Sequence, residues 1–159
     1  MFLRKLFLLL CFLTASHPAI ALEVGDELKL PELKTIQGKI FTQVDYSKRF
    51  TIVQIWATTC PFCRFQNKNL DELLKKIEPK QVNLILLSVD KNTKVVEDYL
   101  EKNQYRFDVV MMTPDLTKRF GKRRWIPELY VIDPKGKIIQ KDMGQMIDLD
   151  IYDLARFAR

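Results

Sequence analysis

Two cysteines, Cys60 and Cys63, are the residues of this chain whose type and spacing could support chemistry. They stand in the stretch "TTCPFC" with two residues between them, and the third cysteine, Cys11, lies in an apolar N-terminal stretch. Such a pair can form a structural disulfide, bind a soft metal ion such as copper(I), or exchange disulfides with another protein. In the chain-entropy model, closing so short a loop contributes about 2 kcal/mol, against about 4.7 kcal/mol for a hundred-residue loop. A purely structural role would therefore stabilise the protein little.

Few other groups are available to work with these thiols. The single histidine, His17, lies in the N-terminal leader, so the rest of the chain has no imidazole for cysteine–histidine catalysis or for histidine-ligated zinc or haem. A structural zinc site needs four ligands, and two thiolates supply only half of them. No resident metal is therefore predicted. Two interpretations stay open, a redox couple and a copper(I) carrier or assembly factor that uses the same two thiolates.

Residues 1–21 have the pattern of a secretory signal peptide. Arg4 and Lys5 precede an apolar run from Leu6 to Ala15, and the segment closes with "AIA" at 19–21. The run is about half of the roughly 20 residues that span a bilayer, so we expect cleavage near Ala21 rather than a membrane anchor. Residues 22–159 would then be one periplasmic or otherwise extracytoplasmic domain. Its positive charge, 24 Lys and Arg against 20 Asp and Glu once Arg4 and Lys5 of the leader are removed, favours acidic protein partners or lipid surfaces over nucleic acid.

Alternating strand and helix patterns surround the cysteines. Short apolar pieces around a turn at Gly38 indicate an N-terminal β-hairpin, and "DPKG" at 133–136 indicates a second hairpin near the end. This order predicts an α/β fold with a central mixed sheet flanked by helices. The expected strands are 51–57, 82–89, 108–112, 128–133 and 137–143, and the expected helices are 62–79, 93–103, 114–120 and 149–157.

A strand that runs directly into a helix places Cys60 at the helix N-terminus. Unpaired backbone N–H groups and the helix dipole favour a thiolate there, and Pro61 suits the first helical position because its missing N–H is not needed. Cys63 follows one turn later, close enough to resolve a mixed disulfide formed on Cys60. The pattern therefore favours a catalytic redox couple.

The stretches "WATTCPFC" and "IPELYVIDPKGKI", together with the leader, resemble the exported thioredoxin-like family typified by TlpA, ResA and CcmG. The resemblance implies a thioredoxin-like fold for residues 22–159 and a redox-active Cys60–Cys63 disulfide without another cofactor. It also implies that Pro127 is a cis-proline opposite the cysteines and that Trp56, Ile126 and Pro127 contact the protein substrate. A thiol peroxidase on the same fold would need Thr or Ser where this chain has Ala57.

The same resemblance implies a direction and partners for the reaction. Members of this family mostly act as reductants of protein disulfides, are recharged by a membrane electron donor, and serve cytochrome c maturation or other cysteine proteins. We therefore expect an extracytoplasmic thiol-disulfide oxidoreductase that acts as a reductant.

The sequence departs from the family at several positions. Thr59 replaces the tryptophan that commonly precedes the first cysteine, and Gln54 and Gln66 occupy positions where relatives place an acid that takes the proton of the resolving thiol. Water or Glu128, just after the proline, is the expected proton acceptor instead. A basic run before the proline is expected to border the active site and to attract acidic partners; its members are Lys118, Arg119, Lys122, Arg123 and Arg124.

Overall fold

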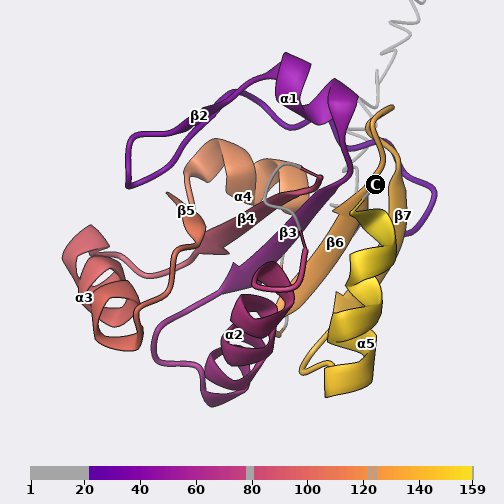
Figure 1. Ribbon diagram of the computed structural model, residues 1–159. Helices are drawn as coiled ribbons and strands as arrows, with labels where there is room; N and C mark the ends of the chain where they lie inside the picture. Colours follow the sequence, from indigo (N-terminus) through magenta and orange to yellow (C-terminus); the bar gives the residue numbers. More distant parts are fainter. Residues whose placement is uncertain (1–21, 78–80, 122, 124, 159) are drawn as a thin grey trace, which may run out of the picture.

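A mixed β-sheet forms the centre of the protein. Figure 1 shows the computed structural model, which describes residues 22–77, 81–121, 123 and 125–158. In this part of the chain the central sheet has five strands in the order β5-β4-β3-β6-β7. β3 pairs in parallel with β4, β4 pairs in parallel with β5, and β6 pairs antiparallel with both β3 and β7. The bounds are β3 (Thr51–Trp56), β4 (Asn83–Ser88), β5 (Asp108–Met111), β6 (Glu128–Ile132) and β7 (Ile138–Met143). The predicted mixed sheet is confirmed.

Helices cover both faces of this sheet (Figure 1). Three helices pack on one face: α2 (Pro61–Leu74), α3 (Thr93–Asn103) and α5 (Asp148–Asp153), the last continued by a 3₁₀ turn, η1 (Leu154–Phe157). The other face is covered by α1 (Gln43–Lys48), by α4 (Pro114–Phe120) and by the N-terminal segment with its small antiparallel sheet of β1 (Leu33–Lys34) and β2 (Ile40–Phe41). The expected N-terminal hairpin is thus present.

An apolar layer lies on each face of the sheet, which explains why the sequences of the central strands are nearly continuous apolar runs. Every residue of β3 and of β4 is buried, as expected for strands with helices on both faces. Ile52 and Trp56 point into the layer beneath α2, and Val53 and Ile55 point into the opposite layer. This alternation decides which side chains of the site can meet.

The structure adds one helix to the predicted elements and shortens another. Residues 43–48 form α1, a helix that the sequence pattern did not predict, and its first turn is held by Asp45, which accepts hydrogen bonds from the Thr42 N–H at 2.8 Å and hydroxyl at 2.9 Å. The helix predicted over 62–79 ends at Leu74, and residues 78–80 lie outside the described part. The predicted signal peptide at 1–21 also lies outside it. Among the described residues, no helix is long and apolar enough to cross a membrane.

Candidate active site

The two cysteines lie where β3 passes into α2. Cys60 is the N-cap of α2, Pro61 is its first residue, and the Cys60 sulfur accepts a hydrogen bond from the Cys63 N–H at 3.2 Å. The side chains form a disulfide, with the two Cα atoms 5.2 Å apart. Once the disulfide is reduced, the same N–H and the helix dipole favour a thiolate on Cys60. The predicted position of Cys60 at a helix start is confirmed.

Solvent reaches the two cysteines unequally. Cys60 is half-buried, whereas Cys63 has no exposed area and belongs to the apolar layer beneath α2. A large disulfide-bonded molecule can therefore approach the sulfur of Cys60 but not that of Cys63.

A cis peptide bond faces the cysteines, as the resemblance to the thioredoxin-like family implied. The bond joins Ile126 to Pro127, and the Ile126 carbonyl oxygen lies 3.6 Å from the Cys60 sulfur. The antiparallel pairing of β6 with β3 carries this peptide to the active site, and the Pro127 carbonyl accepts the Gly144 N–H at 2.8 Å. Ile126 is half-buried and Pro127 is buried, so Ile126 offers its backbone beside Cys60.

Phe62 and Trp125 are exposed aromatic residues next in sequence to the cysteines and to the cis peptide, and they are 60% and 69% exposed. Phe62 lies between the cysteines and Trp125 directly precedes Ile126. Trp56, in contrast, has no exposed area and packs against Tyr99, with their ring centroids 5.2 Å apart. The prediction that Trp56 contacts substrate is therefore wrong, because the side chain points into the core. Phe62 could have been found from sequence, since a large apolar residue two positions after a helix N-cap, beside an accessible cysteine, has no core to enter.

Three buried amides take the place of the family acid. Gln54 Nε2 donates to Asn67 Oδ1 at 2.6 Å, and Gln66 Nε2 donates to Gln54 Oε1 at 2.8 Å. The chain of bonds continues at both ends, from the Met146 N–H to Gln66 Oε1 at 2.9 Å and from Asn67 Nδ2 to the Tyr99 hydroxyl at 3.3 Å. All three amides are 0% exposed. The two glutamines singled out in the sequence thus bond to each other and form a neutral network in the layer that contains Cys63.

Glu128 lies on the other face of the sheet. It is the register partner of Ile55 on the neighbouring strand β3, so both side chains point to the face opposite α2. Its Oε1 accepts a hydrogen bond from the Tyr130 hydroxyl at 2.5 Å. Burial, and then this hydrogen bond to Glu128, raise the pKa of Tyr130. The next residue, Leu129, points into the layer that contains Cys63. The prediction that Glu128 accepts the Cys63 proton is therefore wrong, because strand alternation directs the two side chains to opposite faces.

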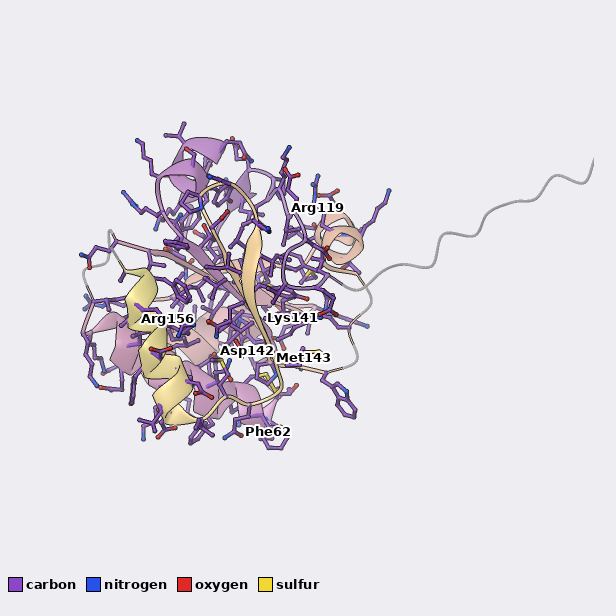
Figure 2. The ribbon with its side chains drawn as sticks, turned by 90° about the vertical axis from the view of Figure 1, so that its right-hand side faces the viewer. Phe62, Arg119, Lys141, Asp142, Met143 and Arg156 are labelled. Atoms are coloured by element: carbon purple, nitrogen blue, oxygen red, sulfur yellow. A yellow bond between two sulfur atoms is a disulfide. The ribbon has the colours of Figure 1, made fainter. Side chains whose placement is uncertain are left out.

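The basic residues between 118 and 124 do not all lie beside the cysteines. Arg119 binds Asp115 at 2.7 Å and the Lys29 carbonyl at 3.2 Å, and Figure 2 shows it toward the opposite end of the molecule from Phe62. Lys118 belongs to the same helix, α4. A guanidinium nitrogen of Arg123 is buried. Lys122 and Arg124 lie outside the described residues. The prediction is wrong for Arg119, since α4 packs on the face that does not carry α2.

Together, the sheet, the cysteine pair at a helix N-terminus and the cis-proline opposite it define a thioredoxin-like thiol-disulfide oxidoreductase. Residues 24–141 match the AhpC/TSA family, and the chain belongs to that family.

Individual relatives agree with this classification. The thiol-disulfide oxidoreductase ResA of Bacillus thuringiensis subsp. konkukian is 25% identical over 125 residues, which cover 78% of this chain and 72% of the relative. Sporulation thiol-disulfide oxidoreductase A of Bacillus subtilis is 23% identical over 150 residues, covering 91% of this chain and 90% of the relative. A crystal structure of a thioredoxin-family thiol:disulfide interchange protein from Chlorobium tepidum superposes with a TM-score of 0.75 at 23% identity, covering 87% of this chain and 99% of that one. This last likeness shows the fold.

Proposed function

We propose that the protein reduces disulfides of other proteins outside the cytoplasm, with Cys60 as attacking thiolate and Cys63 as resolving thiol. The single observation that carries the proposal is the difference in exposure of the two cysteines, since Cys60 is half-buried and Cys63 fully buried. An incoming disulfide must react first at Cys60.

The reaction proceeds in two balanced steps. The Cys60 thiolate attacks one sulfur of the substrate disulfide, which forms a mixed disulfide and releases the first substrate thiolate. The Cys63 thiolate then attacks the Cys60 sulfur, which forms the Cys60–Cys63 disulfide and releases the second substrate thiolate. The substrate gains two electrons and the protein loses them. Each released thiolate takes up a proton, and the Cys63 proton leaves to water because the nearby network consists of amides.

The Ile126 backbone and the exposed rings of Phe62 and Trp125 form the proposed contact surface for substrate. An extended substrate segment can pair its main chain with the Ile126 peptide, next to the Cys60 sulfur. The apolar rings can pack on side chains that flank the substrate cysteine. Arg64, exposed in the first turn of α2, adds positive charge that favours an acidic partner surface.

The proposed location and partners follow from the sequence and the family. The leader at 1–21 supports export with cleavage near Ala21, and a reductant outside the cytoplasm needs a membrane electron donor to restore its dithiol. Cytochrome c maturation supplies one class of candidate substrate, apoprotein cysteines that must be reduced before haem attachment.

Redox equilibration with glutathione tests the direction of this reaction. A reductant should have a reduction potential below that of the glutathione couple and should reduce insulin disulfides, and Cys60→Ser should abolish that activity. A potential well above that of glutathione would contradict the reductant role and indicate a disulfide donor.

A further inference from the structure

Asp90, which follows β4, holds the loop between β3 and α2. Its carboxylate accepts hydrogen bonds from the Thr58 N–H at 2.9 Å, from the Thr58 hydroxyl at 2.8 Å and from the Ser88 hydroxyl at 2.8 Å. Thr58 is 3% exposed and Ser88 is 0% exposed. Three donors therefore converge on one carboxylate beside the loop that carries Cys60, and the disulfide chemistry itself does not use this group.

The contacts continue from Asp90 to Cys60 through a single peptide group. The Thr58 N–H belongs to the same peptide as the Ala57 carbonyl, and this carbonyl accepts the Cys60 N–H at 3.2 Å. Hydrogen bonds linked through one peptide group polarise each other and share one orientation. Asp90 thus holds the backbone N–H of Cys60 in place indirectly, through the peptide group between Ala57 and Thr58.

Arg64 holds the other side of this loop. Its Nε donates to the Thr58 carbonyl at 2.7 Å, and its backbone N–H donates to the Cys60 carbonyl at 3.1 Å. The N–H, the hydroxyl and the carbonyl of Thr58 are therefore all bound, and each is bound to a charged side chain. Hydrogen bonds of this kind are stronger than those between neutral groups. The loop cannot shift without losing at least one of them.

We propose that Asp90 is a positioning residue for disulfide exchange, acting through Thr58 to hold the Cys60 sulfur against the Cys63 N–H. The inference rests on the proposed role of Cys60 as the attacking thiolate. Only a carboxylate suits the position, because donors reach both of its oxygens, whereas an asparagine amide has one acceptor oxygen. A displaced loop would weaken the hydrogen bond from Cys63 N–H and so destabilise the Cys60 thiolate.

Two variants test the proposal, Thr58→Val and Asp90→Asn. The pKa of the Cys60 thiol is measured in the reduced protein from the pH dependence of alkylation by iodoacetamide. We expect both variants to raise this pKa. A rise of about one unit would lower the thiolate fraction about tenfold below the pKa and, after the gain in intrinsic nucleophilicity, slow alkylation about threefold.

Asp45→Asn is a matched control, because the Asp45 carboxylate also accepts the N–H and the hydroxyl of one threonine, Thr42, both at Oδ2, at the start of helix α1. It should lower the urea midpoint of unfolding to a similar extent and leave the Cys60 pKa unchanged. Thr58→Val keeps every backbone contact, so it carries the test if Asp90→Asn does not fold.

The charge change in Asp90→Asn makes the direction of the shift decisive. Removing a negative charge near a thiol lowers its pKa, so a raised pKa in this variant can come only from lost positioning. An unchanged or lowered Cys60 pKa in both folded variants would overturn the proposal. Failure of the unsubstituted protein to exchange disulfides through Cys60 would instead overturn the proposed function, so the two failures are distinguishable.

Discussion

Replacing Gln54 with glutamate would place an ionisable group in the buried amide network with a change of a single atom. Gln54 Nε2 donates to Asn67 Oδ1 at 2.6 Å, and its Oε1 accepts from Gln66 Nε2 at 2.8 Å. The ionised glutamate keeps the acceptor and loses the donor, whereas the protonated glutamate can still donate through its O–H. Asn67 can restore the bond by rotating its amide so that its nitrogen faces the carboxyl, while the Tyr99 hydroxyl turns to donate to the Asn67 oxygen. The fold should therefore accept Gln54→Glu.

The free-energy change follows from the burial of this position, which is 0% exposed. Burial disfavours a charged carboxylate and raises the pKa of a glutamate by about 3 units, from about 4.3 in the unfolded chain to about 7. Each unit corresponds to 1.36 kcal/mol, so the largest loss is about 4 kcal/mol. Because the folded pKa is the higher one, the stability is retained below about pH 4 and lost as the pH rises toward about 7.

Urea unfolding of the oxidised protein at a series of pH values measures this loss. The difference in unfolding free energy between the wild-type protein and Gln54→Glu should grow from about pH 4 to about pH 7 and then level off. Gln145→Glu, at an exposed position between β7 and α5, is the control and should show little pH dependence. A difference for Gln54→Glu that is constant with pH, or that grows toward acidic pH, would refute the reasoning.

Two further predictions concern the surface of the molecule. Hydrogen bonds from the Thr42 N–H and hydroxyl hold the pKa of Asp45 below its ordinary value, so Asp45→Asn should destabilise the protein at neutral pH. In urea titrations that difference should fade as the pH falls through the lowered pKa, because the wild-type carboxylate then also becomes protonated. Phe62→Ser should slow reduction of insulin severalfold and leave reduction of glutathione disulfide unchanged. Val95→Ser, which also replaces an exposed apolar side chain with serine but on α3, is the control and should change the reduction of neither substrate. Equal slowing of both substrates by Phe62→Ser would show that the ring acts on the cysteines rather than on the partner.

Local sequence patterns predicted the core of the fold because its strands and helices each have a characteristic spacing of apolar residues within a short stretch of chain. The all-buried runs of β3 and β4 and the change of period after Pro61 placed Cys60 correctly at a helix start. Helix α1 was missed because its six residues are too few to show a helical spacing of apolar side chains. Thr42 and Asp45, three positions apart, are nevertheless the type of pair that begins a helix.

The arrangement around the cysteines depends on contacts between distant segments, and sequence reasoning recovered it only in part. The cis-proline at 127 was predicted from the family motif. The opposite faces of Glu128 and Cys63 depend on how β6 pairs with β3, and the burial of Trp56 depends on the packing of α2 and α3 over its strand. The hydrogen bonds of Asp90 to Thr58 join residues 32 positions apart, and no local pattern indicates them.

The amide network bears on how Cys63 loses its proton when the acid found in relatives is replaced by glutamine. The sequence shows two glutamines where relatives place acids, and the structure shows that these glutamines bond to each other and to Asn67. Neutral groups thus occupy both positions, and the network keeps its charge state over the physiological pH range. The resolving step should therefore depend on pH mainly through the thiols themselves.

Trapping of the mixed disulfide tests the central claim most directly. Reduced Cys63→Ser and Cys60→Ser proteins are each incubated with a disulfide-bonded protein substrate, and the products are separated without reducing agent and identified by mass spectrometry. The account predicts a stable complex linked through Cys60 in Cys63→Ser and none in Cys60→Ser. A complex linked through Cys63, or equal amounts of complex in both variants, would contradict it.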